Sequence, residues 1–133
     1  VVLKVLLHKN LMTAHVETAD YNVVTKAYMV VIANAGKYGT GAVINPDGNI
    51  GDGLFEIVIL RRLSLSHLFK MFRSQKYIDP NKVEILKTKA VKITTRKKTH
   101  FQIDGEYKGK IQEVKAEILP AQLKIIVSSK NND

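Results

Sequence analysis

Two short turns in this basic chain place carboxylates next to glycine at the edge of an apolar, strand-like run. The first is Gly-Asp-Gly-Leu-Phe at residues 51–55, and the second is Ile-Asp-Gly-Glu at residues 103–106. Such turns present charged oxygens to a metal ion or a proton without the cost of burying them in the core. If the turns meet in space they form part of one site; if they do not, both are ordinary hairpin corners.

The first turn contains the ligand types that Mg²⁺ prefers. This ion takes hard oxygen ligands, keeps several waters and often uses only one or two protein carboxylates. Asp52 offers a carboxylate, and the glycines on either side, Gly51 and Gly53, let neighbouring backbone carbonyls turn toward the same ion. On spacing alone, the favoured interpretation is still an Asp-Gly hairpin corner, which needs no ion.

The second turn suits proton transfer. Asp104 and Glu106 are two residues apart across Gly105. A carboxylate at this position can accept the proton of a substrate hydroxyl if the two groups come within hydrogen-bond reach. Taken alone, this turn also fits a hairpin corner better than a catalytic site.

A glycine-rich segment, residues 34–41, follows the strongest predicted strand. It begins at Asn34 and has three glycines in six positions, namely Gly36, Gly39 and Gly41. Loops of this kind let backbone N–H groups approach a phosphate closely. The segment lacks the lysine–serine/threonine pair of a P-loop and the strand–helix context of a dinucleotide fingerprint.

Short β-rich runs dominate the rest of the sequence and predict an antiparallel all-β fold, a β-sandwich or a barrel. One segment breaks this pattern: Leu65, Leu68, Phe69 and Phe72 recur at helical spacing after serines that suit an N-cap. We therefore expect one short helix at about residues 64–75. The predicted strands are residues 1–7, 15–18, 27–34, 41–44, 55–60, 90–95, 99–103, 112–119 and 123–128.

The composition of the chain narrows the kinds of molecule that it is expected to bind. The 133 residues suit one domain, and the net charge of +9 favours anionic partners such as phosphates, nucleic acid or acidic lipid headgroups. Seven basic residues and one acid, Glu84, lie between Lys82 and Lys98. There is no cysteine, so disulfides and thiolate metal sites are excluded. The four histidines lack metal-ligand spacing: His8, His15, His67 and His100.

In order along the chain, these pieces resemble one known family. The segments are residues 30–41, 44–47, 51–59 and 102–106. Their order and spacing are similar to the C-terminal domain of the diacylglycerol kinase-like lipid kinases, which include bacterial lipid kinases and sphingosine kinases. The likeness runs from about Ala27 to Val127.

The resemblance implies a two-domain, ATP-dependent kinase that phosphorylates a lipid hydroxyl of diacylglycerol type. Residues 1–133 are then its C-terminal lipid-binding β-sandwich. The N-terminal ATP-binding domain, with its GGDGT-type motif, is absent from this sequence, which starts in mid-strand like a piece of a longer protein. The resemblance leads us to expect that the chain alone is inactive.

The family's sites transfer to particular residues here. The resemblance places a Mg²⁺ site on Asn49, Asp52 and Leu54, through the Asp52 carboxylate and the two backbone carbonyls. It places the proton acceptor on Glu106, with Asp104 as the alternative, and the loop containing Asn34, Gly36, Gly39 and Gly41 near the active site. Many relatives carry a second acid where this chain has Gly51.

The implied partners are a lipid substrate, an anionic membrane surface, the N-terminal kinase domain in cis and a second copy of the chain in a homodimer. The implied location is cytoplasmic and peripheral to a membrane. Two other readings stay open: a basic nucleic-acid-binding β-barrel and a non-catalytic interaction domain. Nucleic-acid-binding barrels stack bases on aromatic residues, yet no aromatic residue lies between Tyr77 and Phe101. The identity of the lipid stays open.

Overall fold

The computed structural model describes residues 11–34, 37–38, 42–43, 48–62, 81–120 and 122. Throughout these residues, all regular secondary structure is β-strand. In chain order the strands are β1 (Met12–Glu17), β2 (Asn22–Ala27), β3 (Met29–Ala33), β4 (Lys37–Tyr38), β5 (Ala42–Val43), β6 (Phe55–Leu60), β7 (Val83–Thr88), β8 (Ala90–Ile103) and β9 (Glu106–Glu117).

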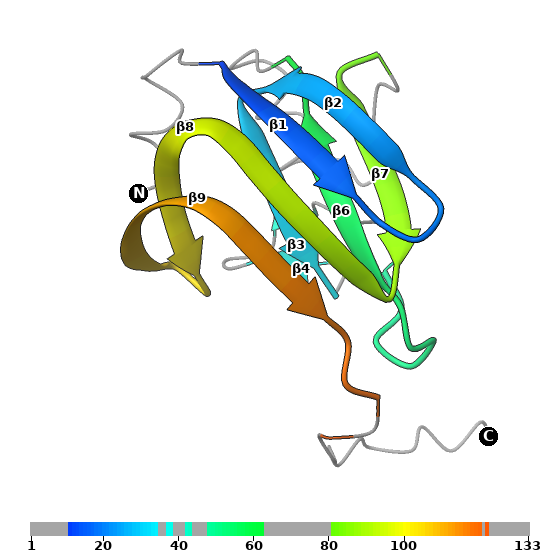
Figure 1. Cartoon of the computed structure of the whole chain (residues 1–133). Helices are drawn as coiled ribbons and strands as arrows, with labels where there is room; N and C mark the ends of the chain where they lie inside the picture. The colour runs from blue at the N-terminus through cyan, green and yellow to red at the C-terminus, as the bar shows by residue number, and fades with distance from the viewer. Residues whose placement is uncertain are drawn as a thin grey trace, which may run out of the picture.

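The strands form two main antiparallel sheets, so the predicted β-sandwich is confirmed (Figure 1). One sheet has the strand order β2-β1-β8-β9 and the other has the order β3-β6-β7, while β4 and β5 form a separate two-stranded ladder. The chain changes sheet twice over a single residue, at Tyr28 between β2 and β3 and at Lys89 between β7 and β8. At the first crossing, the Tyr28 N–H donates to the Leu60 carbonyl at 2.9 Å.

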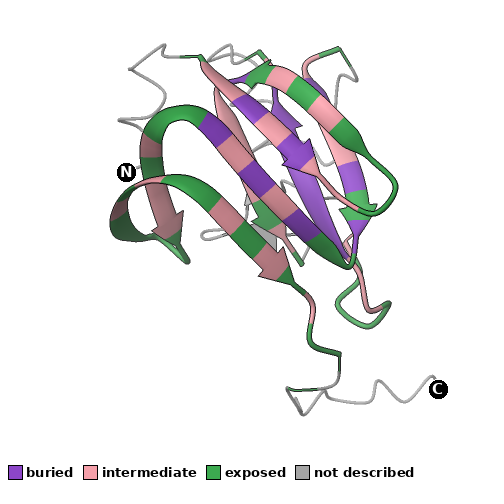
Figure 2. Cartoon of the chain, viewed as in Figure 1, coloured by how far each residue is buried: buried purple, intermediate pink, exposed green. Residues whose placement is uncertain are grey.

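The main core lies between the two sheets. Because side chains alternate along a strand, β6 sends Phe55, Ile57 and Ile59 into this layer, where they meet Val16 and Ile93 of the other sheet. The opposite face of β6 contributes to a second apolar cluster with β7 and β3. As a result every residue of β6 is buried, whereas β9 has no buried residue (Figure 2).

β8 is long and strongly bent. Its register with β9 shifts between Thr94, which pairs with Glu113, and Thr99, which pairs with Ile111. Over this interval β8 advances five residues while β9 advances two, so β8 carries a bulge that bends the strand. The Thr95 hydroxyl stabilises the bulge by donating to the Lys97 carbonyl at 2.9 Å.

Three strands were missing from the sequence prediction, and one was divided. The missed strands are β2, β4 and β7, and the segments predicted at 90–95 and 99–103 form the single strand β8. Burial along β7 departs from simple alternation, because Val83 packs in the cluster with β6 and β3 while Leu86 packs in the core between the sheets. The helix expected at 64–75, and the strands expected at 1–7 and 123–128, lie outside the described residues.

No helix in the described part of the chain has the length and apolar character needed to span a membrane.

Candidate functional site

The turn before β6 is held together by its own polar side chains. The Asn49 side-chain oxygen accepts a hydrogen bond from the Gly51 N–H at 2.9 Å, and Asp52 Oδ1 accepts one from the Leu54 N–H at 2.9 Å. The Asp52 N–H lies 3.4 Å from the Asn49 carbonyl oxygen. These Asx turns are the local bonds that Asn and Asp make with the backbone two residues further on.

This turn brings the three predicted Mg²⁺ ligands into one short segment. Asn49 and Asp52 are exposed and Leu54 is half-buried. One Asp52 oxygen is already bonded to the Leu54 N–H, and the donor set offers a single carboxylate with backbone carbonyls. These are hard oxygens that fit Mg²⁺ in type, and a set with one carboxylate leaves most coordination positions to water.

The described residues contain no group of three or more His, Cys, Asp or Glu side chains able to hold a metal ion. Gly51 does not have positive φ, unlike Gly53 at 70°. A Cβ at Gly51 would lie 3.4 Å from Asn49 Oδ1, which is ordinary van der Waals contact. The backbone therefore has room for a second acid at this position.

The second acidic turn is the tight hairpin between β8 and β9. Ile103 pairs with Glu106, so the loop has two residues, Asp104 with φ 48° and Gly105 with φ 88°. Positive φ at both positions defines a type I′ turn, which Asp-Gly favours. The interpretation of this turn as a hairpin corner is confirmed, and the same turn presents Asp104 and Glu106 to solvent.

Glu106 has a cationic partner that the sequence prediction missed. The Lys108 ammonium lies 2.6 Å from Glu106 Oε2, and the side chains are 47% and 75% exposed respectively. Lys108 lies at a register irregularity, where β9 has one residue more than β8 between the pairs Phe101–Gly109 and Gln102–Tyr107. The spacing of an acid and a lysine two positions apart was the available signal. The ion pair engages Oε2 of a carboxylate that is 75% exposed and can accept a proton.

A polar pair lies on the same hairpin. His100 Nδ1 is 3.0 Å from the Tyr107 hydroxyl, and the two ring centroids are 5.6 Å apart. Tyr107 pairs across the ladder with Gln102, whereas Glu106 pairs with Ile103. Adjacent residues of a strand point to opposite faces, so the His100–Tyr107 pair lies on the other side of the hairpin from the Glu106 carboxylate.

The two acidic turns lie next to the two ends of the long strand β8. The first turn leads into Phe55, which pairs with Thr88, the last residue of β7, two residues before β8 begins at Ala90. The second turn follows the other end of β8, which is 14 residues long and bent at its bulge (Figure 1). Asp52 and Glu106 are therefore held by different turns of the described fold.

The predicted loop after β3 is described only in part. Asn34 is exposed directly after β3, and β4 and β5 pair through Lys37 with Val43 and Tyr38 with Ala42. Gly36, Gly39 and Gly41 lie outside the described residues. The expected position of this loop near an active site therefore stays a prediction.

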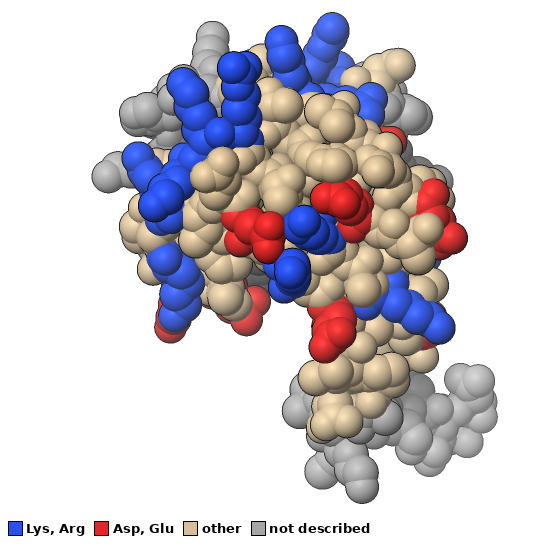
Figure 3. Space-filling model, in the orientation of Figure 1, with Lys and Arg blue, Asp and Glu red and all other residues tan. Residues whose placement is uncertain are grey.

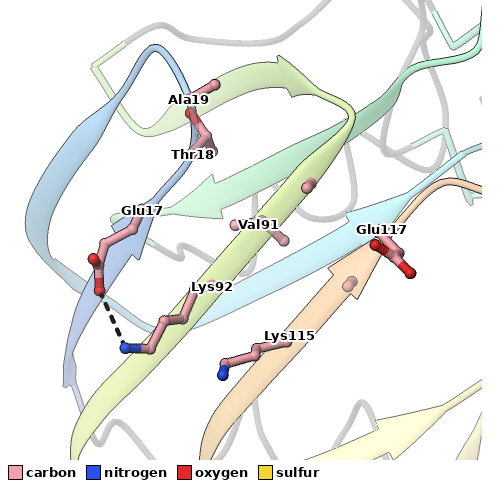
Figure 4. Close-up of a pocket in the computed structure, with 9 residues that line it drawn as sticks. Glu17, Thr18, Ala19, Val91, Lys92, Lys115 and Glu117 are labelled. Carbon is pink, nitrogen blue, oxygen red and sulfur yellow. Dashed lines mark ion pairs between the residues drawn. The ribbon is translucent and has the colours of Figure 1, made fainter.

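An open hollow lies on the outer face of the four-stranded sheet and contains none of the predicted site residues (Figure 4). Lys92 in this hollow is 3.9 Å from Glu17 and 3.8 Å from Glu113. Exposed ion pairs of this kind contribute little binding or folding energy. The lining residues are Glu17, Thr18, Ala19, Ala90, Val91, Lys92, Lys115, Ala116 and Glu117.

Comparisons with known proteins cover nearly the whole chain. Residues 2–127 match the family described as YegS C-terminal NAD kinase beta sandwich-like domain. The chain is 26% identical over 85 residues to a diacylglycerol kinase of Bacillus subtilis (strain 168), an alignment that spans 62% of this chain and 27% of that protein.

Solved structures share the fold. A diacylglycerol kinase of Bacillus anthracis str. Sterne has a TM-score of 0.68 at 17% identity, covering 86% of this chain and 42% of that chain. A second structure from the same organism has a TM-score of 0.71 at 17% identity, covering 89% and 41%. This chain thus spans less than half the length of these relatives. It belongs to the family of YegS C-terminal NAD kinase beta sandwich-like domains, which confirms the resemblance to the C-terminal domain of diacylglycerol kinase-like lipid kinases.

Proposed function

We propose that this chain is the C-terminal, lipid-binding half of a two-domain kinase that transfers the γ-phosphoryl group of ATP to the hydroxyl of a diacylglycerol-like lipid. Family membership over residues 2–127 supports the proposal, as does the name of the Bacillus subtilis relative. A separate N-terminal domain makes most of the contacts with ATP. The chain works at the cytoplasmic face of a membrane, with which it associates peripherally.

The observation that carries the proposed chemistry is the Glu106 carboxylate at the tip of the β8–β9 hairpin. It is 75% exposed, so a hydroxyl on a bound lipid has access to it. In the proposed step, the hydroxyl oxygen attacks the γ-phosphorus, its proton passes to Glu106, and ADP leaves. Phosphoryl transfer depends mainly on positioning and charge stabilisation, and a rigid type I′ hairpin holds its carboxylate in a defined place.

Two neighbouring groups have proposed supporting roles. Asp104 is the alternative proton acceptor, since it is exposed in the same turn. Lys108, 2.6 Å from Glu106 Oε2, positions the carboxylate through their ion pair. The loop containing Asn34, Gly36, Gly39 and Gly41 is proposed to lie near the nucleotide phosphates.

We further propose that Asn49, Asp52 and Leu54 hold Mg²⁺, through the Asp52 carboxylate and the two backbone carbonyls. A bound Mg²⁺ would supply positive charge that fixes the turn leading into β6. Since this turn and the hairpin lie at opposite ends of β8, the ion acts on structure, and Glu106 acts on the substrate.

The replacement Glu106→Gln in the full-length kinase tests the proton acceptor. Glutamine keeps the size and hydrogen-bonding oxygen but cannot take the proton, so we expect the rate of lipid phosphorylation to fall by ~10²–10⁴. The matched control is Glu113→Gln, which removes another exposed, lysine-paired carboxylate of β9 and is expected to retain activity. Wild-type turnover by Glu106→Gln would transfer the role to Asp104, and wild-type turnover by Asp104→Asn as well would refute both assignments.

A further inference from the structure

The positively charged side chains of β8 differ in whether they are paired with acidic side chains. Before its bend, Lys92 is neutralised by Glu17 and Glu113 at 3.9 and 3.8 Å. At the bend, Arg96, Lys97 and Lys98 follow one another in the interval where β8 has more residues than β9. We name these three consecutive residues the basic bulge.

The basic bulge is exposed and has no acidic partner among the described residues. Arg96, Lys97 and Lys98 are all exposed, and none of them forms an ion pair with a described side chain. Figure 3 shows Lys and Arg side chains gathered over the bend of β8, with the acidic side chains lying mainly below it. Lys110, which pairs with His100 on the adjoining part of the ladder, extends the same exposed charge.

Hydrogen bonds to neighbouring side chains hold the basic bulge in place. Thr95, which is 8% exposed, anchors the bulge from below by donating to the Lys97 carbonyl at 2.9 Å. The Gln112 amide lies 3.4 Å from the Arg96 carbonyl and supports the bulge from β9. A bulge re-aims side chains at the edge of a ladder, and this one directs consecutive cations outward where a regular strand would alternate them.

We propose that the basic bulge is the surface by which this domain docks on an anionic phospholipid bilayer. The choice of a phospholipid bilayer as the binding partner rests on the proposed function, because a lipid substrate resides in a bilayer. A convex cluster of unpaired cations complements a flat, negatively charged surface, and each Lys or Arg near such a surface strengthens attraction to it. Proteins that bind single-stranded nucleic acid instead use a groove with aromatic stacking platforms. The nearest aromatics here are Phe101, which is half-buried, and Tyr107, which is exposed but engaged with His100.

The position of the basic bulge also suits the proposed chemistry. Lys98 and Ile103, the partner of Glu106, are five positions apart on β8. At about 3.3 Å per residue, this is roughly 17 Å of strand. Docking through the basic bulge therefore leaves Glu106 free of the contact itself.

Vesicle co-sedimentation of the 133-residue chain tests this inference. We expect salt-sensitive binding to vesicles of phosphatidylglycerol mixed with phosphatidylcholine, and weak binding to phosphatidylcholine alone. The triple variant Arg96→Gln/Lys97→Gln/Lys98→Gln should bind the anionic vesicles about 100-fold more weakly, from the loss of three interfacial cations. The double variant Lys97→Gln/Lys98→Gln should lose about tenfold or more.

The matched control is Lys89→Gln/Lys92→Gln/Lys115→Gln, which removes the same net charge before the bend and should retain binding within about threefold. Equal losses in both triple variants would overturn the inference, because net charge alone would then explain binding. Equal binding to both kinds of vesicle would also overturn it. So would tighter, bulge-dependent binding to single-stranded RNA at the same salt. The assay contains no ATP, so failure here leaves the proposed phosphorylation standing, and a catalytic failure of Glu106→Gln leaves docking standing.

Discussion

Glu56 on β6 is a carboxylate that the fold buries at an energetic cost. It is 1% exposed, and neither oxygen has a hydrogen-bond partner. Lys87, opposite it on β7, brings its ammonium to 3.4 Å from Oε1, an ion pair whose geometry does not make a hydrogen bond. Glu56 shares its face of β6 with Val58 and Leu60, so the carboxylate lies beside an apolar cluster with one cation at its rim.

We predict that Lys87→Met destabilises the chain by about 1–3 kcal/mol. Removing the partner of a buried charge leaves that charge uncompensated, although the 46% exposure of Lys87 reduces the effect below that of a fully buried pair. Urea denaturation measures the free energy of unfolding. Lys115→Met, which breaks an exposed pair with Glu113, should cost less than about 0.5 kcal/mol. Equal costs for the two variants would show that Glu56 does not depend on Lys87.

At the scale of the element, the turn at residues 49–54 is stabilised by its own hydrogen bonds and has a proposed second role as a metal site. Its Asx bonds stand without an ion, so Mg²⁺ is expected to tighten a turn that already exists. Only one carboxylate, Asp52, is offered, and Gly51 leaves space for another. Metal affinity at this turn should therefore be weak and should rise with added negative charge.

We predict that Gly51→Asp increases the thermal stabilisation that Mg²⁺ provides and that Asp52→Asn removes it. At a Mg²⁺ concentration ten times Kd, binding contributes about 1.4 kcal/mol, or a rise in Tm of roughly 3–6 °C. Asparagine keeps the oxygen that accepts from the Leu54 N–H, so the turn survives the second replacement. Differential scanning fluorimetry with and without Mg²⁺ measures the difference. Asp104→Asn is the control, and an equal loss in that variant would argue against a site at Asp52.

The elements that sequence predicted are those specified by local chemistry. Asp104 and Gly105 favour positive φ in any context, so the hairpin corner was predictable, as was the buried strand β6 from its apolar run. β7 was missed because its burial depends on apolar residues from another strand of the same sheet, which periodicity does not reveal. The bulge in β8 was missed for a related reason. Its position depends on the register with β9, and sequence marked only the positive charge there.

At the scale of the molecule, the proposed metal turn and the proposed proton acceptor lie next to the two ends of β8, which is 14 residues long and bent at its bulge. Sequence placed both in turns, but the turn at residues 49–54 is not the hairpin corner that its spacing favoured, because the strand it leads into, β6, pairs with β3 and β7. Phosphoryl transfer needs a nucleotide held in line with the acceptor hydroxyl, and a lone carboxylate at a hairpin tip does not provide that.

We therefore predict that the purified chain has no lipid kinase activity by itself. With ATP, Mg²⁺ and diacylglycerol in mixed vesicles, radiolabel transfer to lipid should stay at the level of a protein-free blank. The full-length kinase should form product, and Glu106→Gln in that protein should not exceed the expected residual rate. Under the same conditions the isolated chain should still sediment with anionic vesicles, because the basic bulge belongs to this domain alone. ATP-dependent phosphorylation by the purified wild-type chain, abolished by Glu106→Gln in the same chain, would show that this half carries a complete site and would overturn the two-domain proposal.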